Sequence, residues 1–366
     1  MSFANRATAS YITGRKSTSF PTQSGGVFSS SALRIMRFNM ADSDGAWADG
    51  GTLRVAFTIQ NNGSSAIQPT TLSPASLFRR ARILCGGTEI FDLLDYGRVH
   101  QLFSMQLPAA RQAENAVEGW GSSSTLDSPS TLQHPLQPLS IGGGASRRVL
   151  MQLLCPFFSQ GKMLPLSLLG SLVLELELDD ADMCFSGSGT NWSLVRPMIL
   201  CDVVQVDPQL SNSFAQHLLS GKELPISYDN LFSFVTTVAP SDVVSIPIYR
   251  GFSRAKAVYV TFVQPGTQYN TTFSCPLGGA ASTTSNDHFR IYIQHGSTRN
   301  PLYEVESIAE VFYRNRLCAQ ISDGTDTFGI QCSDFVGSKF WSAFLLENAA
   351  GEAIHSGTTP WAKSSM

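Results

Sequence analysis

The sequence has few charged residues. Asp, Glu, Lys and Arg make up 14% of its 366 residues, whereas soluble domains usually contain roughly 25%. The formal net charge is −3, so the chain as a whole lacks the basic surplus that is typical of nucleic-acid-binding proteins. Hydrophobic residues reach 43%, with 23 phenylalanines. This composition favours many short strands and extensive subunit contacts over an isolated soluble enzyme.

The sequence also lacks cysteine pairs of the kind that bind zinc or build a disulfide framework. Its seven cysteines are odd in number, and none belongs to a Cys-x-x-Cys pair. Because disulfides persist mainly in oxidising compartments, we expect the chain to fold in a reducing one. We find neither the apolar core of a secretory signal nor a run of ~18 apolar residues. We therefore expect neither secretion nor a membrane span.

Apolar and polar residues alternate in several segments, as is typical of strands with one buried face. In the segment 172–178, leucines alternate with Glu175 and Glu177, so the leucines face one side of the strand and the carboxylates the other. We interpret this acidic side as a solvated or interfacial face. Related patterns predict further strands at 53–59, 77–85, 147–154, 192–206, 258–262 and 289–293.

A strand, a glycine turn and a short helix follow one another once in each half of the chain. Helical spacing of apolar residues predicts the helices near 96–103 and 305–312. The preceding turns at Gly86 and Gly296 are 296 − 86 = 210 residues apart. This repeat indicates a duplicated domain. Two similar domains with many strands and long loops favour tandem jelly-roll sandwiches.

No combination of residues predicts a catalytic, cofactor or metal site. A cupin-type metal site needs two histidines one residue apart, and the nearest pair, His288 and His295, is too widely spaced. The segment 251–255 matches only half of the G-x-S-x-G elbow of hydrolases. The glycines 142–144 lack the Lys-Ser/Thr ending of a phosphate loop, and the Asp-rich loop 42–49 lacks EF-hand spacing. We interpret these segments as turns.

The region around the acidic strand resembles the major capsid proteins of tailless icosahedral DNA viruses. In that family an apolar strand, Pro, Phe, Gly and Leu-Pro-Leu precede a strand that alternates with Glu. Here the same order occupies 150–158, Gly161, 164–166 and 172–178. The order and spacing of further similar passages support the resemblance, which covers most of residues 20–360 and is nearest to polinton-like viruses and virophages. These passages are 87–99, 210–226, 291–312 and 344–357.

The resemblance implies an all-β protein of two tandem jelly-roll sandwiches with a few short helices and long loops. We predict a flexible N-terminal arm at 1–25, jelly roll 1 at 26–206, a linker helix and re-entry at 207–226, and jelly roll 2 at 227–366. The second half reaches Met366 without the closing strand that the family leads us to expect. That strand is then dispensable, supplied by a neighbour, or missing from an incomplete sequence.

The resemblance further implies a non-enzymatic major capsid protein that needs no cofactor. Three copies would form a pseudo-hexameric capsomer, and capsomers would tile the icosahedral shell of a virion. The implied partners are other copies, neighbouring capsomers, and penton and minor capsid proteins. We also expect the basic N-terminal arm to contact an inner membrane or the genome, without specific nucleic-acid recognition. Synthesis and assembly are expected in a reducing compartment, the host cytoplasm or nucleus.

Other functions remain open from the sequence. A carbohydrate-binding β-sandwich protein would need exposed aromatic platforms, for which Trp120, in the predicted surface loop 110–144, is the only obvious candidate. A penton or minor capsid protein is usually built around a single jelly roll, which the apparent duplication disfavours. A sandwich-fold enzyme would need a His and carboxylate cluster that we do not find.

Overall fold

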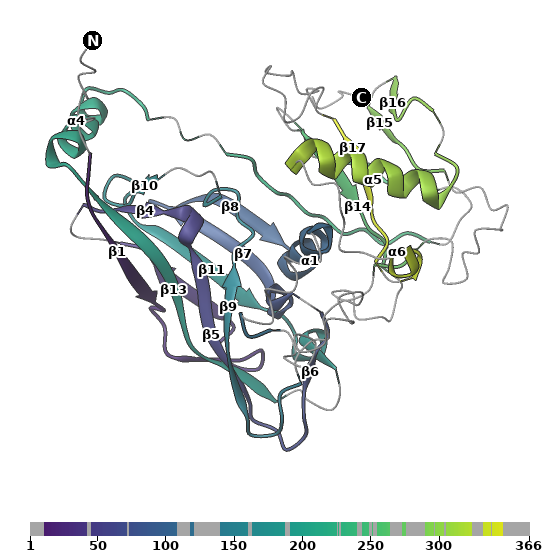
Figure 1. The fold of residues 1–366 in the computed structure, drawn as a ribbon, viewed down its shortest axis with the longest axis horizontal. Helices are drawn as coiled ribbons and strands as arrows, with labels where there is room; N and C mark the ends of the chain where they lie inside the picture. Colours follow the sequence, from purple (N-terminus) through teal and green to yellow (C-terminus); the bar gives the residue numbers. More distant parts are fainter. Residues whose placement is uncertain are drawn as a thin grey trace, which may run out of the picture. The chain divides into compact units, whose positions relative to one another are not determined.

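The structure is a computed structural model that describes residues 11–346 with internal gaps. The longest gaps are 108–117, 121–139, 264–272, 276–289 and 324–331. The chain divides into two compact units (Figure 1). Unit 1 contains residues 1–100, 118–120 and 138–234, and unit 2 contains residues 101–117, 121–137 and 235–366.

Unit 1 is a sandwich of two antiparallel sheets. The larger sheet has the order β10-β4-β13-β5-β9, with β1 and β2 also paired to β13, and the smaller has the order β3-β11-β7-β8. The rings of Phe57 in β5 and Phe78 in β7 meet edge to face at 5.7 Å between the sheets. The strands are β1 Ile12–Pro21, β2 Val27–Phe28, β3 Ile35–Asn39, β4 Trp47–Asp49, β5 Arg54–Asn61, β7 Phe78–Cys85, β8 Thr88–Leu94, β9 Ser146–Gln152, β10 Met163–Pro165, β11 Leu172–Leu178 and β13 Trp192–Val206.

Short helices and one small sheet complete unit 1. Strands β6 Gln68–Pro69 and β12 Phe185–Ser186 pair with each other. Asp207 caps α4, because its carboxylate accepts a hydrogen bond from the Gln209 amide at 2.8 Å. The helices are η1 Gly50–Thr52, η2 Pro74–Leu77, α1 Tyr96–Gln106, α3 Ala181–Cys184 and α4 Pro208–Leu219. The residues of α1 from 101 onward belong to unit 2.

The alternating strand and its neighbours form as the sequence predicts. Strand β11 lies between β3 and β7, and its leucines are buried in the core of the sandwich. The predicted strand 192–206 is observed with those bounds as β13, which spans the larger sheet. The helices predicted near 96–103 and within 207–226 are observed as α1 and α4.

The prediction of a flexible arm at residues 1–25 is wrong for the part that the structure describes. Ile12–Pro21 forms β1, which pairs with β13 over most of its length, and Thr22 forms a bridge to Phe38. Of the β1 side chains only Phe20 is buried. The strand is therefore held by its backbone ladder and a few polar side chains. Its sequence has no apolar alternation from which a strand could be predicted. Residues 1–10 lie outside the described residues.

The described part of unit 2 combines two small sheets with two helices. Strand β14 Ala257–Val260 pairs with β17 Ser342–Leu345, and β15 Ile293–His295 pairs with β16 Thr298–Asn300. The predicted strand 289–293 overlaps these only at Ile293. The helix predicted near 305–312 is observed as the longer α5 Ile308–Asp323, and α6 spans Cys332–Gly337.

A buried asparagine joins α5 to β17. Asn315 is fully buried; its Nδ2 donates to the Trp341 carbonyl at 2.6 Å, and its Oδ1 accepts from the Ala343 amide at 2.8 Å. Both ends of the amide are therefore satisfied inside the core. Within the residues that the structure describes, no helix has the length and apolar character to cross a membrane.

Candidate functional site

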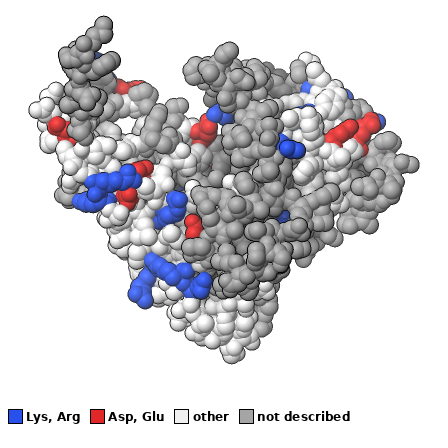
Figure 2. All heavy atoms as spheres, in the orientation of Figure 1, with Lys and Arg blue, Asp and Glu red and all other residues white. Residues whose placement is uncertain are grey.

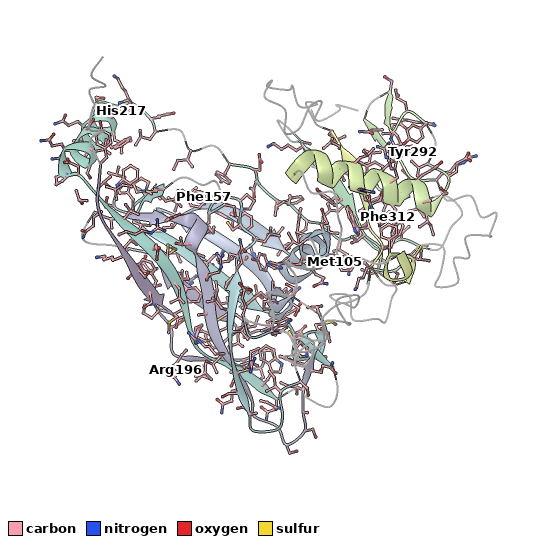
Figure 3. The ribbon with its side chains drawn as sticks, in the orientation of Figure 1. Met105, Phe157, Arg196, His217, Tyr292 and Phe312 are labelled. Atoms are coloured by element: carbon pink, nitrogen blue, oxygen red, sulfur yellow. The ribbon has the colours of Figure 1, made fainter. Side chains whose placement is uncertain are left out.

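Charged side chains lie in small groups on the described surface, most of them of mixed sign (Figure 2). Within the described residues, no three His, Cys, Asp or Glu side chains are placed to hold a metal ion. Residues 42–44, 252–254 and His288, which belong to the calcium, hydrolase and cupin candidates, lie outside the described residues. His217 lies on α4 (Figure 3).

The structure brings together one hydroxyl–imidazole pair that the sequence does not predict. Ser73 Oγ lies 2.7 Å from His100 Nδ1, and His100 Nε2 lies 3.1 Å from the Gln152 carbonyl oxygen. Because a carbonyl only accepts, Nε2 carries the proton and Nδ1 accepts from the serine. This is the geometry of an activated nucleophile. However, Ser73 is only 1% exposed and its oxygen also caps η2 by accepting from the Ala75 amide.

The Ser73–His100 pair is therefore a structural link between η2, α1 and β9. No substrate reaches a hydroxyl that is closed off in this way, and the group behind the imidazole is a carbonyl rather than a carboxylate. Burial lowers the pKa of His100 to about 4. The imidazole is therefore neutral at neutral pH. Cysteine chemistry is disfavoured in the same way, since burial raises the pKa of the Cys155 thiol to about 12.

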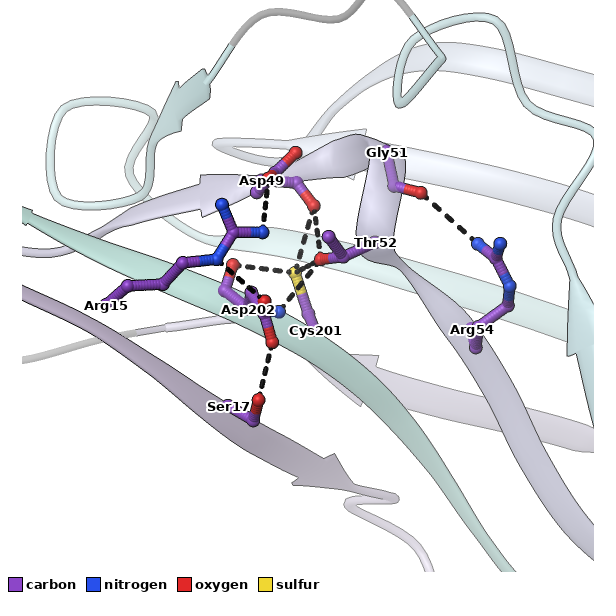
Figure 4. A network of polar contacts seen from close by, with 8 residues as sticks. All are labelled: Arg15, Ser17, Asp49, Gly51, Thr52, Arg54, Cys201 and Asp202. Atoms are coloured by element: carbon purple, nitrogen blue, oxygen red, sulfur yellow. Dashed lines mark hydrogen bonds and ion pairs between the residues drawn. The ribbon is translucent and has the colours of Figure 1, made fainter.

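A polar network fastens β1 to the larger sheet (Figure 4). Arg15 donates from Nε to Asp202 and from Nη2 to Asp49, each over 2.8 Å. Ser17 donates to the other oxygen of Asp202 at 2.6 Å. Thr52 accepts from the Asp202 amide at 2.9 Å and donates to the Asp49 carbonyl at 2.8 Å. One arginine thus ties the N-terminal strand to β4 and β13.

Replacement of Asp202 by Asn should loosen β1. The hydrogen bond from Ser17, and then that from Arg15, lowers the pKa of Asp202, so the carboxylate stabilises β1 above its ordinary pKa and loses this effect as pH falls through its lowered pKa. At neutral pH we expect amides of Ile12–Pro21 to exchange with deuterium several-fold faster in Asp202→Asn. The matched control is Asp180→Asn, which breaks the Arg34 pair elsewhere. Unchanged exchange in β1 would contradict the clamp.

The acidic face predicted for β11 is largely neutralised. Glu175 is only 4% exposed. Arg82 Nε donates a hydrogen bond to one of its carboxylate oxygens at 2.8 Å. Arg37 Nε lies 2.5 Å from the other oxygen and forms an ion pair whose geometry is not that of a hydrogen bond. Arg37 and Arg82 are its cross-strand partners on β3 and β7. The interpretation as a solvated or interfacial acidic face is therefore wrong at Glu175, while Glu177 stays half-buried.

Comparison with solved structures gives one fold. No protein-family model matches the sequence, and no curated protein is significantly similar to it. A chain of the PBCV-1 virus capsid, in a quasi-atomic model, is similar with a TM-score of 0.61 and 15% identity. PBCV-1 VP54, as fitted into a reconstruction of the virophage Sputnik, is similar with a TM-score of 0.60 and 15% identity. Each similarity covers 98% of this chain and 84% of the other.

The chain has a double-jelly-roll fold. The likeness extends over both halves of the chain, so it confirms the predicted all-β class with two tandem jelly rolls. The sandwich of unit 1 is built on β11 within the smaller sheet and the long β13 within the larger one. At 15% identity the comparison establishes the fold and leaves the function to be argued.

Trp120 lies in the hydrophobic core of unit 1. Its side chain is 2% exposed and its Nε1 donates to the Thr71 carbonyl at 2.9 Å. The one aromatic platform that the sequence offered for carbohydrate binding is therefore not available at the surface. Residues 121–139 of the same predicted loop lie outside the described residues.

Proposed function

We propose that this double jelly roll is the major capsid protein of a tailless icosahedral DNA virus. The observation that carries the proposal is the likeness to a PBCV-1 capsid chain over 98% of the present chain. A likeness confined to one sandwich would fit many binding modules and enzymes, because fold alone does not fix function. A likeness over two tandem rolls is more restrictive. The role is structural, in the virion, and involves no catalysis.

Three copies with two rolls each would give a block with six similar corners. Such a closed ring needs heterologous contacts, in which one face of the chain meets a different face of the next copy. A chain of two similar but diverged rolls supplies two kinds of face. We propose that these blocks meet one another, and penton and minor capsid proteins, to tile the shell.

Exposed apolar side chains favour the proposal that the chain forms large permanent interfaces with other subunits. Phe232, Phe234, Val235 and Val238 are 44%, 50%, 66% and 42% exposed. Obligate interfaces are more apolar than transient ones, and clustered apolar exposure marks interaction surfaces. The low content of charged residues, 14%, fits the same explanation.

The mass of the purified protein in solution tests the proposal. Light scattering should give the mass of a trimer, which is three times 39.6 kDa. The trimer should persist on dilution and in about 1 M NaCl, because apolar contacts are not screened by salt. A monomer that stays folded and monodisperse over the same concentrations would contradict the proposal.

A further inference from the structure

Two arginines of unit 1 lie beside the same threonine. Thr58 of β5 pairs with Arg148 of β9 on one side and with Val195 of β13 on the other, and Arg196 follows Val195. Figure 3 labels Arg196 on this part of unit 1. In the same place, Figure 2 shows a group of basic side chains with no acidic side chain among them.

Hydrogen bonds hold the Arg148 side chain and the Arg196 backbone in place. Arg148 Nη1 donates to Thr58 Oγ1 at 3.3 Å and to the Arg196 carbonyl at 3.1 Å. Arg196 lies at a bulge between Val195 and Met198, with a φ of 50°, and its amide donates to the Gly26 carbonyl at 2.8 Å. A positive φ is unfavourable for a long side chain, and such positions often mark functional sites.

The described residues supply no carboxylate that balances the charges of this pair. Neither arginine forms an ion pair with a carboxylate of the described residues, whereas Arg80 and Arg82 of the other sheet lie beside Asp92 and Glu175. Burial, and then the charge of Arg196, lowers the pKa of Arg148. Two like charges held together by the fold are unfavourable unless an anion lies between them.

We propose that Arg148, Arg196 and the Thr58 hydroxyl bind one phosphate-type oxyanion. Guanidinium groups match the oxygens of phosphate in two-point contacts. Within the described part of the chain, the hydrogen bonds of Arg148 use only Nη1, so Nε and Nη2 can donate to the ion. Thr58 accepts from Arg148 and can therefore direct its own proton to the anion. This inference stands independently of the capsid role.

The surroundings favour a single ion over a nucleic-acid track. The neighbouring outward positions on these strands are Gln60, Leu150 and Val195, which carry no charge. A backbone track needs a row of cations along the polymer. Two arginines and a hydroxyl suit one phosphate group, either free or at the end of a larger molecule.

Thermal unfolding in inorganic phosphate, compared with chloride at equal ionic strength, tests the site. Phosphate should raise the Tm of the protein by a few degrees through binding to the native state. The shift should disappear in Arg196→Asn, in which Asn tolerates the positive φ, and in Arg148→Gln. It should persist in Arg79→Gln, which removes an exposed arginine of β7 from the other sheet. Equal shifts in all variants, or no shift in the unmodified protein, would overturn the proposal.

Calorimetric titration with phosphate at 25 °C covers the case in which a variant melts too early to compare. Heat of binding should be seen for the unmodified chain and Arg79→Gln and be lost in the two site variants. Vesicles that contain phosphatidic acid then identify the source. If they bind and phosphate displaces them, the anion is a headgroup; if they do not bind while phosphate does, it is a free ion. Binding of single-stranded DNA through these arginines, with no effect of phosphate, contradicts a single-ion site.

Discussion

As pH falls from 6.5 to 4, His100 alone is expected to lower the free energy of unfolding by up to about 3 kcal/mol. Burial lowers the pKa of this imidazole from 6.5 to about 4, so in this range the unfolded chain binds a proton that the folded chain does not. Its effect on stability is therefore absent above the unfolded pKa and grows as the solution is acidified. The protonated ring would keep its bond to the Gln152 carbonyl, but Nδ1 would no longer accept a hydrogen bond from the Ser73 hydroxyl.

Chemical unfolding at several pH values, followed by tryptophan fluorescence, measures this effect. His100→Gln should weaken the protein at pH 7, because the Ser73 bond is lost, but should flatten the dependence of unfolding on pH. The matched control is His217→Gln, which removes a histidine from α4 and leaves the contacts of His100 in place. If His100→Gln and the unmodified protein lose the same free energy between pH 6.5 and 4, the neutral buried imidazole is not the cause.

Replacement of Glu175 by Ala should destabilise unit 1 by about 2–3 kcal/mol. The substitution removes the carboxylate that Arg37 and Arg82 share across three strands. Both guanidiniums would then repel each other on the outer face of the smaller sheet. Their partial exposure, 54% and 28%, keeps the cost below that of a fully buried ion.

Glu177→Ala provides the comparison for this effect. It removes the same side chain two residues along the same face of β11, where no ion pair with a described residue is formed, and should cost less than about 1 kcal/mol. Urea unfolding of the two variants gives the difference directly. Equal destabilisation would show that the three-strand ion group contributes nothing beyond an ordinary surface charge.

Local patterns were sufficient to predict the regular elements of unit 1. Alternation located β11, and the apolar run of β13 gave both of its ends, because each pattern reports on one strand and one buried face. Strand β1 was missed for the opposite reason. In its sequence, ITGRKSTSFP, only Phe20 is buried, so the backbone pairing with β13 produces no hydrophobic pattern in the sequence.

Contacts between segments that are far apart in the chain could not be predicted from local sequence patterns. Glu175 meets Arg82 across 93 residues of chain, and the pairing depends on the register of two strands. Arg148 and Arg196 meet only because β5 lies between β9 and β13. The order of several weak motifs over most of residues 20–360, rather than any single residue, predicted the double jelly roll.

Electron cryomicroscopy of the purified protein tests directly whether three double jelly rolls form one capsomer. We expect particles with three-fold symmetry in which six sandwiches surround the axis. Particles that contain one chain and two sandwiches, or closed assemblies without a three-fold axis, would contradict this arrangement.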